Sequence, residues 1–201
     1  MGKSAMLQSP FEKPENGSLD LNEFRQKIRK AWEDYLPAKT NCLLITDAPP
    51  EDLENHFYLA EAKGPEPLFL SVMEILYPEL KADYLNRRRP INARQEMLRK
   101  FQADGFYYLE MLDIPLSYHQ GFLSNAFSDL LVRVKQAAEK TAAVILLKSN
   151  TFEAVYDNLK RVGYRRTAPF TVPFPDQSQT REFEDKFRRA LKYLKVLEKQ
   201  P

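Results

Sequence analysis

The stretch Asn41-Cys42-Leu43-Leu44-Ile45-Thr46-Asp47-Ala48-Pro49-Pro50 decides the fold of this chain. Its apolar part, residues 41–46, is too short for helical periodicity and is typical of a buried strand. The two prolines end the strand abruptly, because proline has no backbone N–H to donate to a sheet. The stretch therefore predicts a buried strand followed by a loop that begins at Asp47.

Three further apolar runs predict strands of the same sheet, at 106–112, at 142–147 and near 166–171. The segments between these runs carry apolar residues at helical spacing. Helices are expected over 20–35, 67–77, 92–101, 127–138, 150–162 and 183–197. Alternating helices and buried strands predict an α/β fold, a three-layer αβα sandwich with a mainly parallel, about four-stranded central sheet.

Local signals indicate where several helices begin and end. Asp20 precedes Glu23 by three residues, the spacing of a capping box. Asn92 and Asn150 are expected to open two further helices in the same way. Gly163 follows the helix expected over 150–162, where glycine commonly ends a helix.

The composition excludes several classes of protein. The 201 residues include 30 Lys+Arg, 28 Asp+Glu and 43% hydrophobic residues, which is typical of a globular chain and not of a disordered or fibrous one. Cys42 is the only cysteine, so an internal disulfide and a cysteine-based zinc site are excluded. No phosphate-binding glycine motif is present. We expect no metal and no cofactor.

The chain is expected to form a flexible N-terminal lead over 1–19 and a single domain over 20–201. No window approaches the roughly 18–20 apolar residues of a membrane-spanning helix, and the first thirty residues are charged where a signal peptide is apolar. These features predict an intracellular, cytoplasmic protein without a membrane partner.

Charge is distributed unevenly along the chain. Residues 1–80 hold 8 basic and 14 acidic side chains and residues 81–201 hold 22 and 14, so the halves stand near −6 and +8. Arg165, Arg166 and Arg181, which lie near the last loop in the sequence, are candidate contacts for DNA phosphates. A solvated protein surface is the alternative interpretation of the same residues.

Two short motifs resemble those of the uracil-DNA glycosylase superfamily. Thr46-Asp47-Ala48-Pro49-Pro50 is similar to its first motif in the Gly-Glu-Ala-Pro-Gly form, and Val172-Pro173-Phe174-Pro175 is similar to its second, His-Pro-Ser-Pro. The order of elements over 20–197 also resembles that superfamily. The resemblance implies recognition of DNA or a nucleobase, and hydrolysis of an N-glycosidic bond.

The resemblance also implies roles for residues of both motifs. It assigns Asp47 to positioning or activating water; an Asp that closes a proline turn is the alternative. Val172 stands where many members carry a histidine that stabilises the leaving base, and valine cannot donate a hydrogen bond. Phe174 replaces a small residue, and Pro173 and Pro175 can preserve the shape of the loop. We therefore expect weak or absent excision, raised by Val172→His; simple packing is the alternative for Val172 and Phe174.

Residues near the motifs are further candidates for the site. His56 can replace the missing donor as a second catalytic residue. His119 is another option, with a simple surface histidine as the alternative interpretation. Phe57 or Tyr58 can form an aromatic floor beneath a flipped base, and burial under the loop is the alternative for either. Asp113 resembles the position that selects the base edge, and its carboxylate would accept from an exocyclic amine.

Ligands of parallel sheets bind beyond the carboxyl ends of the strands. This rule selects the loops at 47–58, 113–119, 148–150 and 173–180, and a nucleobase site requires such loops to converge on one pocket. Two other functions remain open. One is a noncatalytic protein-interaction module on the same fold, and the other is a small-molecule hydrolase that uses Asp47 and His56.

Overall fold

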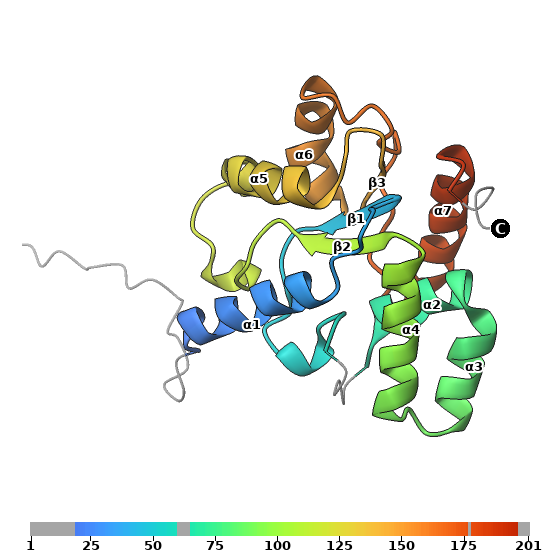
Figure 1. Ribbon diagram of the computed structural model, residues 1–201. Helices are drawn as coiled ribbons and strands as arrows, with labels where there is room; N and C mark the ends of the chain where they lie inside the picture. The colour runs from blue at the N-terminus through green and yellow to red at the C-terminus, as the bar shows by residue number, and fades with distance from the viewer. Residues whose placement is uncertain (1–18, 60–64, 177, 197–201) are drawn as a thin grey trace, which may run out of the picture.

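Three parallel strands lie at the centre of the computed structural model, which describes residues 19–59, 65–176 and 178–196 (Figure 1). They are β1 (Cys42–Thr46), β2 (Phe106–Glu110) and β3 (Ala143–Leu146), in the order β2-β1-β3. Cys42 pairs with Phe106 on one side and with Ala143 on the other. All residues of the three strands are buried, as expected for a parallel sheet covered on both faces.

The fourth predicted strand is present only as two isolated parallel bridges, Val144 with Thr167 and Leu147 with Val172. Between these bridges β3 advances by three residues, from Val144 to Leu147, while the facing segment advances by five, from Thr167 to Val172, so a regular ladder is interrupted there. The sheet therefore has three regular strands where about four were predicted, and the chain near 167–172 still runs beside β3.

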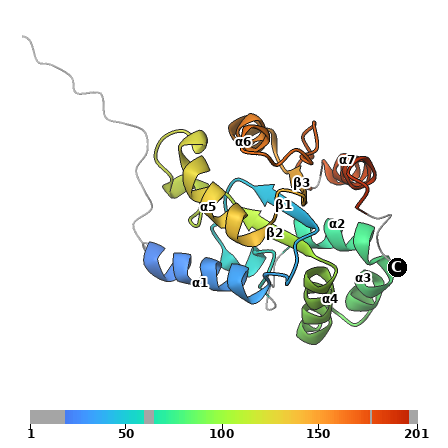
Figure 2. The same cartoon turned by 45° about the horizontal axis from the view of Figure 1, so that its top comes forward.

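Seven α-helices surround the sheet in the described part of the chain, and Figures 1 and 2 show α5 and α6 on one side of it and α1 and α4 on the other. This arrangement confirms the predicted α/β class with three layers. The helices are α1 (Leu21–Asp34), α2 (Pro67–Leu76), α3 (Pro78–Asn86), α4 (Ile91–Ala103), α5 (Phe127–Ala137), α6 (Ser149–Arg161) and α7 (Thr180–Tyr193).

The predicted helix ends are partly confirmed. The Asp20 carboxylate accepts from two N–H groups of the first turn of α1, and Gly163 follows α6 with a φ of 105°. The predictions for Asn92 and Asn150 are wrong, because α4 begins at Ile91 and α6 begins at Ser149. The side chain of Asn150 instead donates a hydrogen bond to the carboxylate of Asp47.

Most of the predicted N-terminal lead, residues 1–18, lies outside the described residues. Within the ranges that are described, no helix is long and apolar enough to cross a membrane. Most buried apolar side chains form one continuous cluster around the sheet.

The single cysteine gives a direct test of this core. Cys42 is fully buried in β1, and burial raises the pKa of its thiol to about 12. Because the thiolate is the reactive form, we expect alkylation of Cys42 only when the chain unfolds. The labelling rate should rise with urea in parallel with unfolding followed by circular dichroism. Rapid labelling of the native protein would contradict the packing described here.

Candidate functional site

A cavity of about 360 Å³ lies at the carboxyl ends of the strands. Its lining includes Asp47 of the first motif-like segment, Phe174 of the second, and Phe57 from the loop between them in sequence. Lys148, Phe69 and neighbouring prolines contribute to the remaining surface. A mostly apolar cavity of this size with a few polar groups is typical of a small-molecule site.

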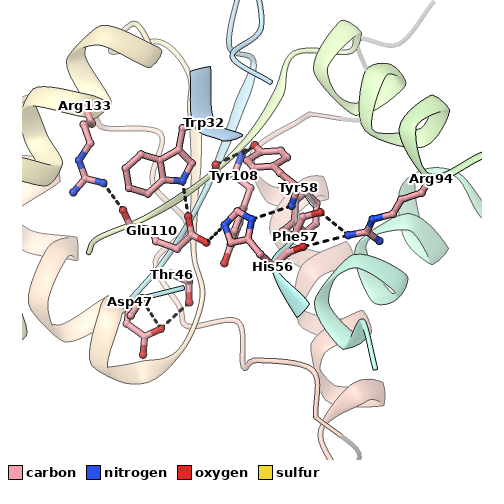
Figure 3. Close-up of polar contacts among 11 residues, drawn as sticks. Trp32, Thr46, Asp47, His56, Phe57, Tyr58, Arg94, Tyr108, Glu110 and Arg133 are labelled. Atoms are coloured by element: carbon pink, nitrogen blue, oxygen red, sulfur yellow. Dashed lines mark hydrogen bonds and ion pairs between the residues drawn. The ribbon is translucent and has the colours of Figure 1, made fainter. Parts of the chain in front are cut away.

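Asp47 is held at this cavity by four hydrogen bonds. Its Oδ1 accepts from the Thr46 hydroxyl at 3.1 Å, from the Ala48 N–H at 2.9 Å and from Lys148 Nζ at 2.7 Å, and its Oδ2 accepts from Asn150 Nδ2 at 3.0 Å (Figure 3 shows the contact with Thr46). Burial alone would raise the pKa of Asp47. The charge of Lys148 and the hydrogen bonds outweigh burial, so the pKa lies below its ordinary value and the group is a carboxylate at neutral pH.

Lys148, which the sequence motifs did not single out, joins the two motif-like segments. Its Nζ lies 2.7 Å from Asp47 Oδ1 and 4.8 Å from the centre of the Phe174 ring. Its backbone N–H donates to the carbonyl of Val172 at 2.9 Å. The backbone of Lys148 has φ 68° and ψ 146°, close to a region that is essentially restricted to glycine.

His56 does not reach the cavity, so its predicted role as a catalytic residue is corrected. Its ring is fully buried, and Nδ1 accepts the N–H of Tyr58 at 3.3 Å. The proton is therefore on Nε2, which donates to Glu110 at 2.9 Å, and Glu110 also accepts from the indole of Trp32 at 2.6 Å (Figure 3). This buried network fixes the loop of residues 56–58 against β2 and α1.

The structure distinguishes between the two aromatic candidates. Phe57 lines the cavity, whereas the Tyr58 hydroxyl accepts the N–H of Tyr108 at 2.7 Å and donates to the carbonyl of Tyr108 at 3.0 Å. Tyr58 thus covers the open edge of β2 as a neighbouring strand would. The prediction that Tyr58 can be the floor for a base is wrong, and Phe57 is the ring in position to contact a ligand.

Arg94 of α4 holds Phe57 in place. Its guanidinium donates to the carbonyl of Phe57 at 2.9 Å and to that of Leu59 at 2.6 Å, and it forms a buried ion pair with Glu66 (Figure 3 shows the contact with Phe57). It also lies over the ring of Phe69, 3.8 Å from its centre. The segment after the first motif is therefore fastened to α2 and α4.

Only Phe174 of the second motif-like segment lines the cavity. Val172 is fully buried in the core, where its N–H donates to the carbonyl of Leu146. Pro173 and Pro175 flank Phe174 without lining the cavity. The packing interpretation therefore holds for Val172, and Phe174, which is half-buried, is the part of this segment that reaches the cavity.

The expectation for Val172→His changes accordingly. A histidine at this position would place a polar ring in the core, so we expect the free energy of unfolding to fall by about 1–3 kcal/mol, with no gain in base excision. Urea unfolding of Val172→His beside the apolar control Val172→Ile measures this. Increased excision with unchanged stability would show that residue 172 reaches the cavity.

Asp113 lies at a different cavity, so the prediction that it selects the base beside Asp47 is wrong. Its carboxylate pairs with Arg25 at 3.3 Å and with Arg29 at 2.6 Å, both on α1. It lines a second cavity, of about 450 Å³, together with residues of α1 and α5. The chain after β2 still donates a backbone hydrogen bond to the carbonyl of Asp47, but these ion pairs direct the side chain of Asp113 toward α1. His119 is half-buried on this segment, 3.4 Å from the carbonyl of Phe122.

The predicted arginine cluster is also dispersed in the fold. Arg166 donates to the carbonyls of Thr141 and Leu194 and lines a third cavity near the beginning of the strands, at the opposite end from Asp47. Arg165 is exposed beside Arg166 in the chain, and Arg181 is exposed in the first turn of α7. Only Arg181 follows the second motif-like segment closely, so the three residues do not form one phosphate site.

No family model matches the chain, and the searches of curated proteins and of solved structures also gave no match. Within the described ranges, no group of three or more His, Cys, Asp or Glu side chains is arranged to hold a metal ion. The functional conclusion therefore rests on the cavity that contains Asp47, Phe57, Lys148 and Phe174.

Proposed function

We propose that this chain is a uracil-DNA glycosylase-like protein that recognises nucleic acid or a nucleobase, with weak or absent base-excision activity. The main support is that residues of both motif-like segments, Asp47 and Phe174, line one cavity at the carboxyl ends of the strands. Phe57 and Phe174 provide flat rings against which a base can stack. The proposal includes a cytoplasmic location and no membrane partner.

The surroundings of Asp47 support weak chemistry. An ionised carboxylate near the sugar can position water and oppose the positive charge that develops when the glycosidic bond breaks. A carboxylate offers about four acceptor positions, and Asp47 already accepts four hydrogen bonds. Three of these bonds go to Oδ1 and only one to Oδ2, so Oδ2 keeps an acceptor position for water. Because Lys148 and these hydrogen bonds lower the pKa of Asp47, its carboxylate is a weak base and is better suited to positioning water and to electrostatic stabilisation than to removing a proton.

Single-turnover assays on uracil- and hypoxanthine-containing oligonucleotides test the proposed activity. We expect weak or undetectable release of base, with any residual release lost in Asp47→Asn. Asp157→Asn, which changes an exposed carboxylate on α6, serves as the charge-matched control. Robust release that survives Asp47→Ala would contradict the assigned role of Asp47.

Binding to DNA is tested separately from chemistry. Because the second half of the chain is basic, affinity for single-stranded or damaged DNA should fall steeply between roughly 50 and 200 mM salt. Fluorescence anisotropy with a labelled oligonucleotide measures the affinity. If the protein binds no DNA even at low salt, a noncatalytic protein-interaction module on the same fold becomes the leading function.

A further inference from the structure

We propose that the third cavity, at the amino ends of the strands, is a second ligand site that binds the phosphate group of a small phosphate monoester. Its lining includes Asn41 and Ala142, directly before β1 and β3, and Phe106, the first residue of β2. The inference goes beyond the proposed function, because this cavity lies at the opposite end of the sheet from Asp47.

The size of the cavity suits a small molecule. Its volume is about 500 Å³, within the range of small-molecule sites, roughly 300–1,000 Å³. The cavity therefore has room for a ligand larger than phosphate alone.

Three cationic side chains from distant parts of the sequence line this cavity. They belong to Lys39, just before β1, to Arg166, whose carbonyl accepts the N–H of Val144 in β3, and to Lys195, just after α7. Lys39 and Lys195 are exposed, and neither forms an ion pair with another described residue. Their charges are therefore available to an anion in the cavity.

The acidic group at this cavity is already compensated. Asp104 is the one acidic residue among the described residues of the lining. Its carboxylate accepts from the hydroxyl of Tyr77 at 2.8 Å and pairs with Lys100 Nζ at 3.1 Å. The three cations thus leave an excess of positive charge, which favours an anionic ligand.

Arg166 is held in place by contacts with the backbone. Its guanidinium donates to the carbonyl of Thr141 at 2.7 Å and to that of Leu194. These bonds use two of the five N–H groups of an arginine, so further donors remain for a ligand. A planar guanidinium can give two parallel hydrogen bonds to a phosphate group, which makes Arg166 the central donor of the site.

Lys195 lies at a backbone position that favours glycine. Its N–H donates to the carbonyl of Lys192 at 3.1 Å, and the N–H of Val196 donates to the carbonyl of Leu191 at 2.9 Å, the two bonds of a Schellman motif that ends α7. In this motif Lys195 has a φ of 52°, which is unfavourable for a residue with a Cβ. The side chain of Lys195 lowers stability relative to glycine and adds a cation to the cavity.

The charges favour a monoester over a diester. A phosphate monoester carries a charge of about −1.5 to −2 at neutral pH, whereas each phosphate of a nucleic-acid backbone carries a single negative charge. Three cations around one cavity attract the more highly charged group more strongly.

Titration of the ¹⁵N-labelled protein with ribose 5-phosphate, followed by NMR at constant ionic strength, tests the site. We expect saturable chemical-shift changes that cluster at Asn41, Thr141 and Lys195, which lie around the cavity. Ribose without the phosphate should cause no such changes.

Two variants test the cations. Lys195→Gly and Lys39→Met each remove one charge and should weaken the affinity for ribose 5-phosphate about 5- to 10-fold. Lys195→Gly should be at least as stable in urea as the wild-type protein, so its loss of binding cannot result from unfolding. Lys135→Met, which removes an exposed charge on α5, is the matched control and should keep the affinity.

Unchanged affinity in both Lys195→Gly and Lys39→Met would overturn the proposal, as would changes that do not saturate and spread over the basic surface. A short oligothymidylate without terminal phosphates offers only diester groups, and its tighter binding at the same residues would overturn the assignment to a monoester. None of these results bears on the nucleobase cavity, because ribose 5-phosphate carries no base.

Discussion

Replacing Arg94 with methionine should lower the free energy of unfolding by about 3–5 kcal/mol, because it leaves the buried carboxylate of Glu66 without its main partner. Both side chains are 1% exposed, and Arg94 also donates to the carbonyls of Phe57 and Leu59. Urea unfolding at neutral pH measures the loss. Lys at position 94 should restore only part of it, since one ammonium group cannot reproduce the planar fork of a guanidinium.

The control for this prediction neutralises the partner. Adding Glu66→Gln to Arg94→Met removes the uncompensated charge, so the double variant should be more stable than Arg94→Met alone. A loss below about 1 kcal/mol in Arg94→Met, or a double variant less stable than the single one, would contradict the importance of this ion pair.

Glu110→Leu is expected to lower the free energy of unfolding by about 2–6 kcal/mol, because it leaves two buried donors without an acceptor. These donors are the indole N–H of Trp32 and the Nε2–H of His56, which contact separate oxygens of Glu110. The loop that carries Phe57 should loosen as well, since His56 is its neighbour. Thermal or urea unfolding, with hydrogen exchange at residues 56–58, measures both effects.

Trp32→Phe separates the contributions of the two donors to stability, because it removes the indole N–H and keeps the hydrogen bond between Glu110 and His56. We expect a loss clearly smaller than that of Glu110→Leu. Equal stability of Glu110→Leu and the wild-type protein would show that the buried network does not stabilise the fold. Both buried networks bear on the site, since Arg94 and His56 together fix the loop on which Phe57 reaches the cavity.

The sheet could be predicted from the sequence because its strands are buried on both faces. Runs such as 42–46 and 143–146 contain almost only apolar residues and are followed within two residues by a charged one, so their nature and approximate limits are local properties. The helix α3 was missed, because Tyr84 is its only buried residue and its apolar pattern is correspondingly weak. Pro78 followed by Glu79 was the available signal for its beginning.

The site could be predicted only in part. Asp47 was identified because a proline-rich turn follows it, and the loop at 148–150 was selected because it follows a strand. The pairing of Lys148 with Asp47 depends on β3 lying beside β1, and strand order is not a local property of the sequence. Arg166 was misplaced for the same reason, since closeness to a motif along the chain does not decide which end of the sheet a residue occupies. Asp113 does follow the carboxyl end of β2, but its ion pairs with Arg25 and Arg29 of α1 depend on tertiary packing.

Glu110 was an available signal in the sequence for a buried polar network at the end of β2. A glutamate at the end of an apolar strand must find partners when it is buried, and here they come from α1 and from the loop after β1. The identities of those partners depend on tertiary packing, so the sequence alone could not supply them. The same limit applied to His56, whose burial removed it from the candidate catalytic residues.

The most direct test of the nucleobase cavity is a titration of the ¹⁵N-labelled protein with free uracil, followed by NMR. We predict saturable chemical-shift changes that cluster at Ala48, Phe57, Lys148 and Phe174, which lie around one cavity. Changes that cluster instead around Asp113 and Arg29, in the cavity beside α1 and α5, or no changes at all, would contradict the proposed site.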